Sequence, residues 1–431
     1  MAEPKQKLTA DDIVCLGHLK KVFPLLDKLK EVGCDRDTAG NRRLFFSDYC
    51  KLMLLYAWNP LLRSIRDLQN AVSLPRVARA MGVERFSLGS FSESCRVFKP
   101  QLLKDVIQEL AGEARTLPAD PRLSDLNLAL TLVDGTVLEA LPRLARAASA
   151  DTRVLKQRDG RELHAYRLHT QLDLATFQPI RIHRTGAANA GDSRESAVLG
   201  RMLDKGRCYV GDAGYARYPM LDQIIDKGSN FVMRLREDCA YQVREERELT
   251  PEARQAGVMA DRVVHLGGGA TMRHPARVIV VKVEPHPRRT RKAQRPHGGD
   301  TDKNYKGQRV CEQLTIGTDL LDLPADLIAL IYQQRYSVEL FFRFFKQLLG
   351  MRHLLSRRAQ GLDTQVYCTV IVCLLINLMT GKKPNKAMVG MIGFYLLGLA
   401  DERDVINHLN KPDNTGVKRR AKDGLWKKLG C

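Results

Sequence analysis

Apolar residues recur at three- and four-residue spacing through the first 120 residues, which is the pattern of helices with one buried face. Residues 12–33 and residues 45–72 show it most clearly. Residues 74–110 then predict short helices around Gly82, and this arrangement resembles a helix-turn-helix, although plain packing of two helices gives the same pattern. We therefore predict a helical N-terminal domain over residues 1–120 that is a candidate for DNA binding.

The period changes from helical to strand-like after residue 125. Residues 126–136 are apolar up to Asp134, which predicts a buried strand with an acid at its carboxyl end. Asp212 follows a second apolar strand in the same way. Paired strands followed by alternating helix and strand predict a mixed α/β sheet with flanking helices over residues 121–237.

The middle of the chain predicts a hairpin, a helix and a β-rich insertion. Residues 164–184 alternate on both sides of a turn, and residues 192–206 predict a helix that ends at Gly206. Residues 238–324 hold short strand candidates without a long helix between them. Inside them, residues 285–309 are rich in Pro, Gly, Lys and Arg, which predicts a mobile loop suited to phosphate contact.

The helical period returns after residue 324. We expect residues 325–385 to complete the sheet-bearing core and residues 386–431 to form a helical C-terminal region with a basic tail. The most apolar run, residues 366–381, is shorter than the roughly 20 residues that span a membrane. We therefore predict that it is a buried core helix. The polar first residues do not have the pattern of a signal peptide.

Charge points to a polyanionic partner. Lys and Arg number 69 against 49 Asp and Glu, a formal net charge of +20. Such a field attracts nucleic acid above all, although a merely soluble basic protein has the same balance. None of the ten cysteines forms a C-x-x-C pair, which argues against a zinc knuckle and is typical of a reducing cytosol.

A helix predicted over residues 331–355 has two unlike faces. At about 100° per residue, four polar side chains fall within an arc of about 60°. The four, which form a polar ridge along the predicted helix, are Tyr332, Arg335, Glu339 and Lys346. Phe341 and Phe345 fall on the opposite side, where they would pack on the sheet. A simple ion pair would explain Arg335 and Glu339, which are four residues apart, but not the rest of the ridge.

The acids suggest a metal site. Ligands of open α/β sheets gather beyond the carboxyl ends of strands, where Asp134 and Asp212 are expected. With Glu339 they would repel one another unless a cation lay between them, and Mg²⁺ prefers such oxygen ligands. Two ions about 3.5–4 Å apart can activate a nucleophile and stabilise the leaving oxygen at a phosphodiester. Arg335 and Lys346 would hold the flanking phosphates.

The same residues resemble the IS4 family of DDE transposases. The spacing Tyr332-x₂-Arg335-x₃-Glu339-x₆-Lys346 looks like its Y-R-E-K signature, and "LVDGT" and "VGDAGY" resemble its first and second Asp regions. The resemblance implies an RNase H-like catalytic domain interrupted by a β-rich insertion. It implies Asp134, Asp212 and Glu339 as catalytic ligands of two Mg²⁺ ions, with Mn²⁺ able to substitute, and DNA contacts by Tyr332, Arg335 and Lys346.

The function expected from this resemblance is cut-and-paste transposition of an insertion sequence. Its partners would be the terminal inverted repeats of its own element and target DNA, bound by a homodimer, with no membrane. It would act in the cytoplasm of a bacterial or archaeal cell. A nuclease without strand transfer and a catalytically inactive DNA-binding regulator are the alternatives.

One feature of this chain departs from the pattern of the family, and it concerns the route of DNA cleavage. In relatives that cut through a DNA hairpin, a Trp of the insertion stacks on a flipped base, whereas this chain has only Trp58 and Trp426, both outside the insertion. Tyr241 and Tyr305 are the candidates to replace it. The departure bears on the hairpin step and leaves the metal site untouched.

Overall fold

The computed structural model of the protein divides into two compact units. The first unit comprises residues 1–118, 135–194 and 339–411, and the second unit comprises residues 119–134, 195–338 and 412–431. The residues that the structure describes are 17–38, 40–59, 61–114, 116–117, 120–140, 154–156, 162–186, 191–268, 271–283, 313–348, 355–356, 358–380, 386–396 and 399–410. The basic loop predicted at residues 285–309 and the basic tail after residue 410 lie outside them.

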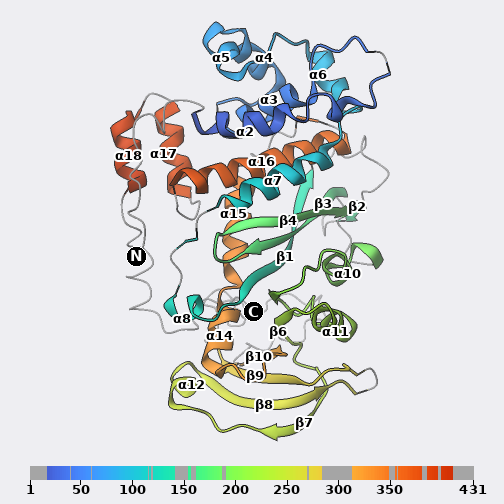
Figure 1. The fold of residues 1–431 in the computed structure, drawn as a ribbon, viewed down its shortest axis with the longest axis vertical. Coiled ribbons are helices and arrows are strands. Elements are labelled where there is room, and N and C mark those ends of the chain that lie inside the picture. Colours follow the sequence, from blue (N-terminus) through green and yellow to red (C-terminus); the bar gives the residue numbers. More distant parts are fainter. Residues whose placement is uncertain are drawn as a thin grey trace, which may run out of the picture. The chain divides into compact units, whose positions relative to one another are not determined.

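The N-terminal part of the first unit is helical, as predicted (Figure 1). Its helices are α2 (Gly17–Asp27), α3 (Phe46–Trp58), α4 (Ile65–Ser73), α5 (Pro75–Met81), α6 (Leu88–Ser94) and α7 (Leu103–Gly112). Buried rings join them: the Tyr49 and Phe91 centroids are 4.5 Å apart, and those of Phe46 and Phe98 are 5.1 Å apart. Left-handed Gly82 (φ 63°) ends α5, and Ser87 caps α6 by accepting from the Ser90 N–H.

The rest of the first unit combines a hairpin with long helices. Its elements are β2 (Val154–Lys156), β3 (Glu162–Asp173), β4 (Gln178–Gly186), α16 (Ala359–Thr380), α17 (Lys386–Leu396), α18 (Glu402–Asn410) and most of α15 (Tyr336–Leu348). β3 and β4 pair antiparallel with His169 opposite His183, so the predicted hairpin is confirmed. Arg184 on β4 forms an ion pair with Asp363 on α16 and fastens the helix to the hairpin.

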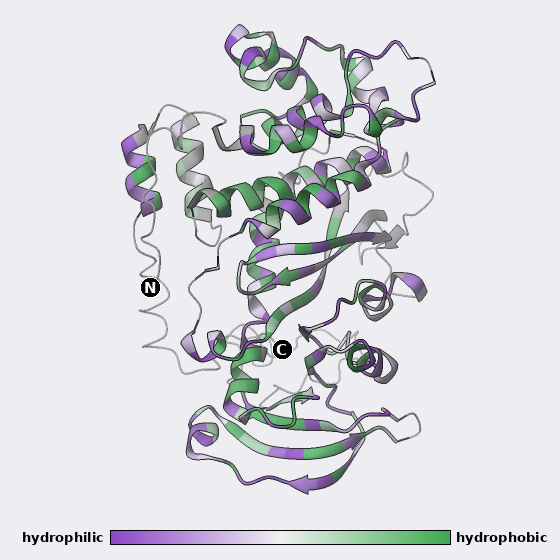
Figure 2. Cartoon of the chain, in the orientation of Figure 1, coloured by the Kyte–Doolittle hydropathy of each residue, from purple (hydrophilic) through white to green (hydrophobic). Residues whose placement is uncertain are grey.

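Helix α16 is the core helix of the first unit. It packs on α3 and α7, and most of its length is hydrophobic (Figure 2). Residues Ala359–Leu378 are long and apolar enough to cross a membrane by length and composition, but 94% of that window is buried inside the protein. The prediction of a buried core helix at residues 366–381 is therefore confirmed within α16.

The second unit is built on a mixed sheet. In sheet order its strands are β1 (Ala129–Ala140), β5 (Arg207–Gly211), β6 (Asn230–Arg234), β10 (Gln313–Thr318), β9 (Ala276–Lys282), β8 (Val258–Leu266) and β7 (Tyr241–Glu246). β1, β5 and β6 are parallel, and the remaining neighbours are antiparallel. The strands of the β-rich insertion therefore continue the sheet rather than forming a separate barrel. After Asp134, β1 continues into the first unit, where β3 is its neighbour.

Helices cover both faces of the parallel strands. The helices of this unit are α8 (Pro121–Ser124), α10 (Glu195–Gly200), α11 (Tyr218–Asp226), α12 (Pro251–Gln255) and α14 (Ala325–Gln333), of which α11 and α14 pack on the parallel strands. Met220 and Ile224 of α11 share one buried cluster with Tyr209 of β5 and Met233 of β6. α14 packs on β5 and β6 from the opposite side (Figure 1). α11 therefore covers one face of the parallel strands. Side chains alternate between the two faces along a strand, so α14 packs on the side chains of the opposite face.

Two elements predicted in the first half of the chain differ from the structure. The helix predicted over residues 192–206 is only the six-residue α10, and Gly206 (φ 75°) lies in a turn before β5. Asp134 does not end its strand, because β1 continues to Ala140. The prediction that a strand ends at Asp134 was therefore wrong. Only the ladder with β5 stops, at Leu132, and β1 continues past Asp134 beside a new neighbour, β3.

Gly211 makes a close approach in the parallel ladder, and we expect Gly211→Ala to destabilise the second unit by about 1–3 kcal/mol. A Cβ atom there would lie 2.8 Å from Met233 Sδ and 2.8 Å from Val133 Cγ2. Gly268→Ala is the matched control, because its Cβ would meet only Ala240 Cβ at 3.5 Å. Calorimetric unfolding measures both variants. Equal transition temperatures for the two would contradict the close packing.

Candidate active site

Two of the predicted acids lie just beyond the end of the β1–β5 ladder. The last paired positions are Leu132 and Val210; Asp134 is two residues further along β1, and Asp212 is the first residue after β5. Residues in register on adjacent parallel strands are about 4.8 Å apart, and side chains two residues apart point to the same face. Both acids are half-buried. Val133 and Gly211, the residues just before them, face the cluster that α11 forms, so alternation assigns the two acids to the other face, on which α14 packs.

The turn after β5 orients Asp212. The backbone N–H of Gly214 donates to Asp212 Oδ1 over 2.9 Å, and the N–H of Tyr215 donates to the Asp212 carbonyl over 3.2 Å. A Cβ atom on Gly214 would come within 2.7 Å of Glu195 Oε2 and 3.1 Å of Asp212 Oδ1. The backbone at Gly214 therefore lies close to two carboxylates, those of Glu195 and Asp212. The turn holds the Asp212 carboxylate in one orientation.

We expect Gly214→Ala to disturb the Asp212 carboxylate without unfolding the chain. The added methyl group displaces either Asp212 Oδ1 or Glu195 Oε2, and changes next to a metal ligand typically cost about 10–100-fold in metal affinity or activity. Gly268→Ala, which adds the same methyl group away from this turn, is again the control. Titration with Mn²⁺ measures the effect. Equal Mn²⁺ affinity in both variants would show that the turn does not orient a ligand.

Glu195 is the residue that sequence reasoning missed. It is the first residue of α10, its side chain is buried, and its carboxylate lies beside Gly214. The signal in the sequence is weak, since an acid in the first turn of a helix is ordinarily explained by the helix dipole. Only the folded chain brings α10 next to the turn that follows β5.

The helix predicted over residues 331–355 is two helices in the structure. α14 ends at Gln333 and α15 begins at Tyr336. Around the junction, N–H groups donate to the carbonyl three residues earlier: Arg335 to Tyr332 and Val338 to Arg335, over 3.0 and 3.2 Å. This tighter turn interrupts the α-helical period, so the prediction of one continuous ridge was wrong. Residues 349–354 lie outside the described part of the chain.

The break separates the polar residues of the predicted ridge. Tyr332 lies on α14 and Arg335 in the junction, and both are buried, with 2% and 8% of their surface exposed. Both belong to the second unit, with Asp134 and Asp212. Tyr332 and Arg335 thus lie at the carboxyl end of a helix that packs on β5 and β6, the strand that leads to Asp212 and its neighbour. A direct contact of Tyr332 or Arg335 with DNA stays a prediction.

Glu339 and Lys346 lie on α15 and are counted with the first unit. The opposite side of this helix is apolar, as predicted: Phe341 and Phe345 stack with centroids 5.9 Å apart. Phe341 also meets Phe177, in the β3–β4 turn, at 6.5 Å. Glu339 and Lys346 are both half-buried. The aromatic face anchors α15 on the hairpin and leaves its polar positions on another side of the helix.

The donors of the second unit fit a hard divalent cation. Mg²⁺ is commonly bound through one or two carboxylates together with waters and substrate phosphates, and Asp134 and Asp212 supply two carboxylates at one end of the β1–β5 ladder. Within the described ranges, no three His, Cys, Asp or Glu side chains gather closely enough to form a metal-binding group by themselves. The chemistry of the pair therefore suits Mg²⁺ held jointly with a phosphate.

Comparison with known proteins gives consistent matches. The family described as "Transposase DDE domain" matches residues 128–376, more than half of the chain. A putative transposase y4zB of Sinorhizobium fredii is 26% identical over 44% of this chain and 47% of its own length. A probable transposase for insertion sequence element IS5377 of Geobacillus stearothermophilus is 22% identical over 54% of this chain and 55% of its own length.

The chain thus spans about half the length of these two relatives. Among solved structures, a piggyBac transposase synaptic complex with hairpin DNA is 11% identical and covers 96% of this chain and 84% of its own, with a TM-score of 0.39. That likeness is too low to carry an argument about the site.

Proposed function

The chain belongs to the transposase DDE domain family, and on that premise we propose that it is a DNA transposase of an insertion sequence. It cuts the ends of its element with the help of divalent metal and joins them to target DNA. The observation that carries the proposal is the position of Asp134 and Asp212 just beyond the last pair of the β1–β5 ladder, together with the packing of α14 on this part of the sheet. We assign it to the IS4 group on its Tyr–Arg–Glu–Lys spacing.

We further propose an RNase H-like catalytic core. Three features support it: β1, β5 and β6 are parallel, the β3–β4 hairpin lies between β1 and β5 in the chain, and β3 neighbours β1 in the sheet. The strands of residues 238–324 then represent an insertion into that core. Residues 121–237 and 325–385 form the core itself, with residues 1–120 and 386–431 as helical additions.

In this proposal the chain's own residues hold metal and orient DNA. Asp134 and Asp212 would hold Mg²⁺ with Glu339 as the third carboxylate, and the Gly214 N–H fixes the orientation of the Asp212 carboxylate. When bound, such ions would supply activation of the attacking water or 3′-hydroxyl and stabilisation of the leaving oxygen. Arg335 presents a planar fork that matches two phosphate oxygens, and Lys346 supplies a point charge.

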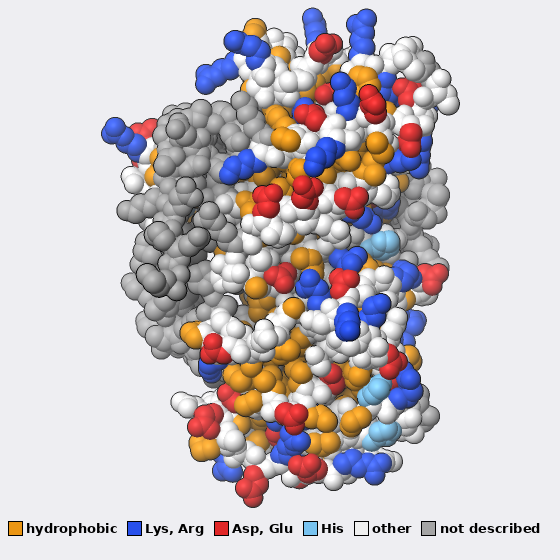
Figure 3. Space-filling model, viewed as in Figure 1, with side chains coloured by type: hydrophobic (Ala, Val, Ile, Leu, Met, Phe, Trp, Pro, Cys, Tyr) orange, Lys and Arg blue, Asp and Glu red, His pale blue; other side chains and the backbone are white. Residues whose placement is uncertain are grey.

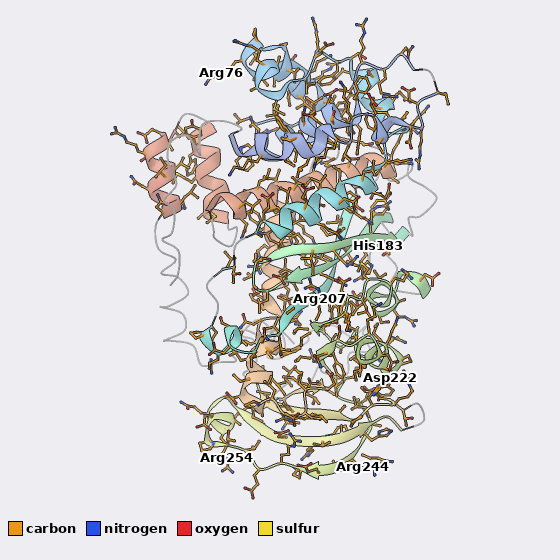
Figure 4. The ribbon with its side chains drawn as sticks, in the orientation of Figure 1. Arg76, His183, Arg207, Asp222, Arg244 and Arg254 are labelled. Atoms are coloured by element: carbon orange, nitrogen blue, oxygen red, sulfur yellow. The ribbon has the colours of Figure 1, made fainter. Side chains whose placement is uncertain are left out.

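The helical N-terminal domain supplies a second surface for DNA. Arg66 on α4 and Arg76 and Arg79 on α5 are exposed. Lys and Arg side chains are prominent over these helices in the space-filling view, and Arg76 points outward from α5 (Figures 3 and 4). Exposed arginines on short helices suit contact with the phosphate backbone, which positions a protein on DNA without reading its sequence.

Three further assignments rest on the same proposal. The active species is a homodimer that brings two element ends together, and it works in the cytoplasm of a bacterial or archaeal cell. Tyr241 is the candidate for stacking on a flipped base; it is half-buried on β7, and its hydroxyl accepts from Arg262 Nη1 over 3.4 Å. Tyr305, the other candidate, lies outside the described residues.

The test is a cleavage and joining assay with DNA that carries the ends of the protein's own element. We expect Mg²⁺-dependent cuts at the ends and joining of the freed 3′-hydroxyl to a target plasmid. Pre-cut ends supplied with a free 3′-hydroxyl separate the alternatives. Cutting without joining would identify a nuclease that lacks strand transfer. Tight binding of the ends without cutting would identify a DNA-binding regulator.

A further inference from the structure

An ion pair between two strands of the insertion is almost completely buried. Arg277 on β9 donates from Nε to Asp261 Oδ1 over 2.7 Å and from Nη2 to Asp261 Oδ2 over 2.5 Å. Arg277 and Asp261 are 3% and 4% exposed. Both ends of the carboxylate are occupied, so the guanidinium plane is fixed. The third nitrogen, Nη1, is directed away from Asp261 and remains available for other acceptors.

Arg277 Nη1 donates to the segment that starts α14. Its acceptors are the carbonyl oxygens of Leu320 at 3.3 Å, of Leu321 at 3.2 Å and of Leu323. Arg247, which follows β7, also donates to the Leu321 carbonyl. Carbonyls ahead of a helix have no partners within that helix, so their orientation depends on groups such as these. Two arginines of the insertion therefore hold the chain between β10 and α14.

The other end of this segment is fastened to β6. Thr318 Oγ1 donates to the Phe231 carbonyl over 2.6 Å, and the Phe231 N–H donates to Asp319 Oδ1 over 2.8 Å. Asn230 Nδ2 donates to Asp319 Oδ2 over 2.7 Å. β6 is the parallel neighbour of β5, the strand that leads to Asp212. The segment is thus fixed to the core sheet on one side and to the insertion on the other.

We infer that Arg277 is a positioning residue for the candidate active site, an inference that rests on the proposed function. By fixing the start of α14, Arg277 sets where the far end of that helix places Tyr332, and Arg335 in the junction just after it, relative to Asp134 and Asp212. α14 has nine residues and is about 13 Å long, so a shift at its start is transmitted to its end. A misplacement of about 1 Å can cost roughly 10²-fold in rate.

If the Arg277–Asp261 pair served only stability, cleavage would recover whenever stability does. Removing one partner of a buried ion pair is strongly destabilising, whereas replacing both with apolar residues of similar volume is often neutral. The double variant Arg277→Met with Asp261→Leu should therefore regain the stability that Arg277→Met alone loses. It cannot regain the donors to the carbonyls of Leu320, Leu321 and Leu323. The double variant therefore separates the effect of Arg277 on stability from its effect on positioning.

The experiment compares the full-length parent, Arg277→Met, the double variant and an Arg262→Met control. Arg262 pairs with Glu246 at the surface over 2.8 Å and does not contact the segment. The measurements are melting temperature, hydrogen exchange of the backbone amides of residues 320–323 and 325–333, and Mg²⁺-dependent cleavage of element ends. We expect the double variant to melt like the parent, to exchange at least about 10-fold faster at these amides, and to cleave about 10–100-fold more slowly.

Recovery of parental exchange and parental cleavage together with the melting temperature in the double variant would overturn the inference. So would equal losses in the Arg262→Met control. Hydrogen exchange keeps the inference testable apart from the proposed function. If the parent does not cleave, the proposed function fails, and parental exchange in the double variant would independently refute positioning by Arg277.

Discussion

Replacing Asp212 by Asn is expected to slow Mg²⁺-dependent cleavage of element ends by about 10³-fold or more while leaving DNA binding nearly unchanged. Metal ions contribute several kcal/mol of charge stabilisation to the transition state, and about 4 kcal/mol corresponds to that factor. The substitution keeps the volume of the side chain and removes the charge that holds the ion. The Gly214 N–H can still donate to the remaining carbonyl oxygen, so the turn is expected to persist.

Asp238→Asn is the matched control for this variant. Asp238 is exposed in the loop after β6, within the same unit, and its substitution removes the same charge. Cleavage rates and binding affinities of the two variants are compared with those of the parent at several Mg²⁺ concentrations. Parental cleavage by Asp212→Asn, with its fold intact, would remove Asp212 from the site. A loss shared by the control would indicate a general effect of charge.

DNA binding is expected to weaken by about 10³–10⁵-fold between 50 and 200 mM salt, as for a protein that makes six to ten phosphate contacts. The net charge of +20 and the exposed arginines of α4 and α5 supply those contacts. Arg76→Ala should lower the slope of log affinity against log salt by about 1. Fluorescence anisotropy with a labelled duplex measures the slope.

Arg254→Ala provides the comparison for the salt experiment. Arg254 is exposed on α12, far along the chain from α4 and α5, and its loss removes the same charge (Figure 4). We expect its slope to match that of the parent. A flat salt dependence in the parent would show that the excess charge serves solubility. Equal changes in both variants would contradict a specific surface on the N-terminal helices.

The sequence predicted the neighbourhood of the two Asp residues well because strand patterns are local. Apolar runs end at Asp134 and Asp212, and the structure pairs those runs as adjacent parallel strands. The same local pattern could not reveal that β1 continues past Asp134, because that depends on a new neighbour, β3. Exchange of one sheet neighbour for another leaves no signature in the alternation of a single strand.

The polar ridge shows where extrapolation of a helical period fails. An arc of about 60° for Tyr332, Arg335, Glu339 and Lys346 assumes an unbroken helix. The tighter turn between α14 and α15 changes the rotation within that interval. Neither Gly nor Pro marks the break in the sequence. The buried carboxylate of Glu195 was also beyond sequence reasoning, since its closeness to Gly214 arises from tertiary packing.

The central claim is that Asp134, Asp212 and Glu339 bind the same divalent metal. Replacing Mg²⁺ by Fe²⁺ tests it directly, because iron with a reductant and oxygen generates radicals that cut the polypeptide beside the bound ion. In the full-length protein with end DNA, we predict cuts next to all three acids, each lost in Asp212→Asn and retained in Asp238→Asn. Cuts beside Asp134 and Asp212 without one beside Glu339, or cuts that persist in Asp212→Asn, would contradict a shared site.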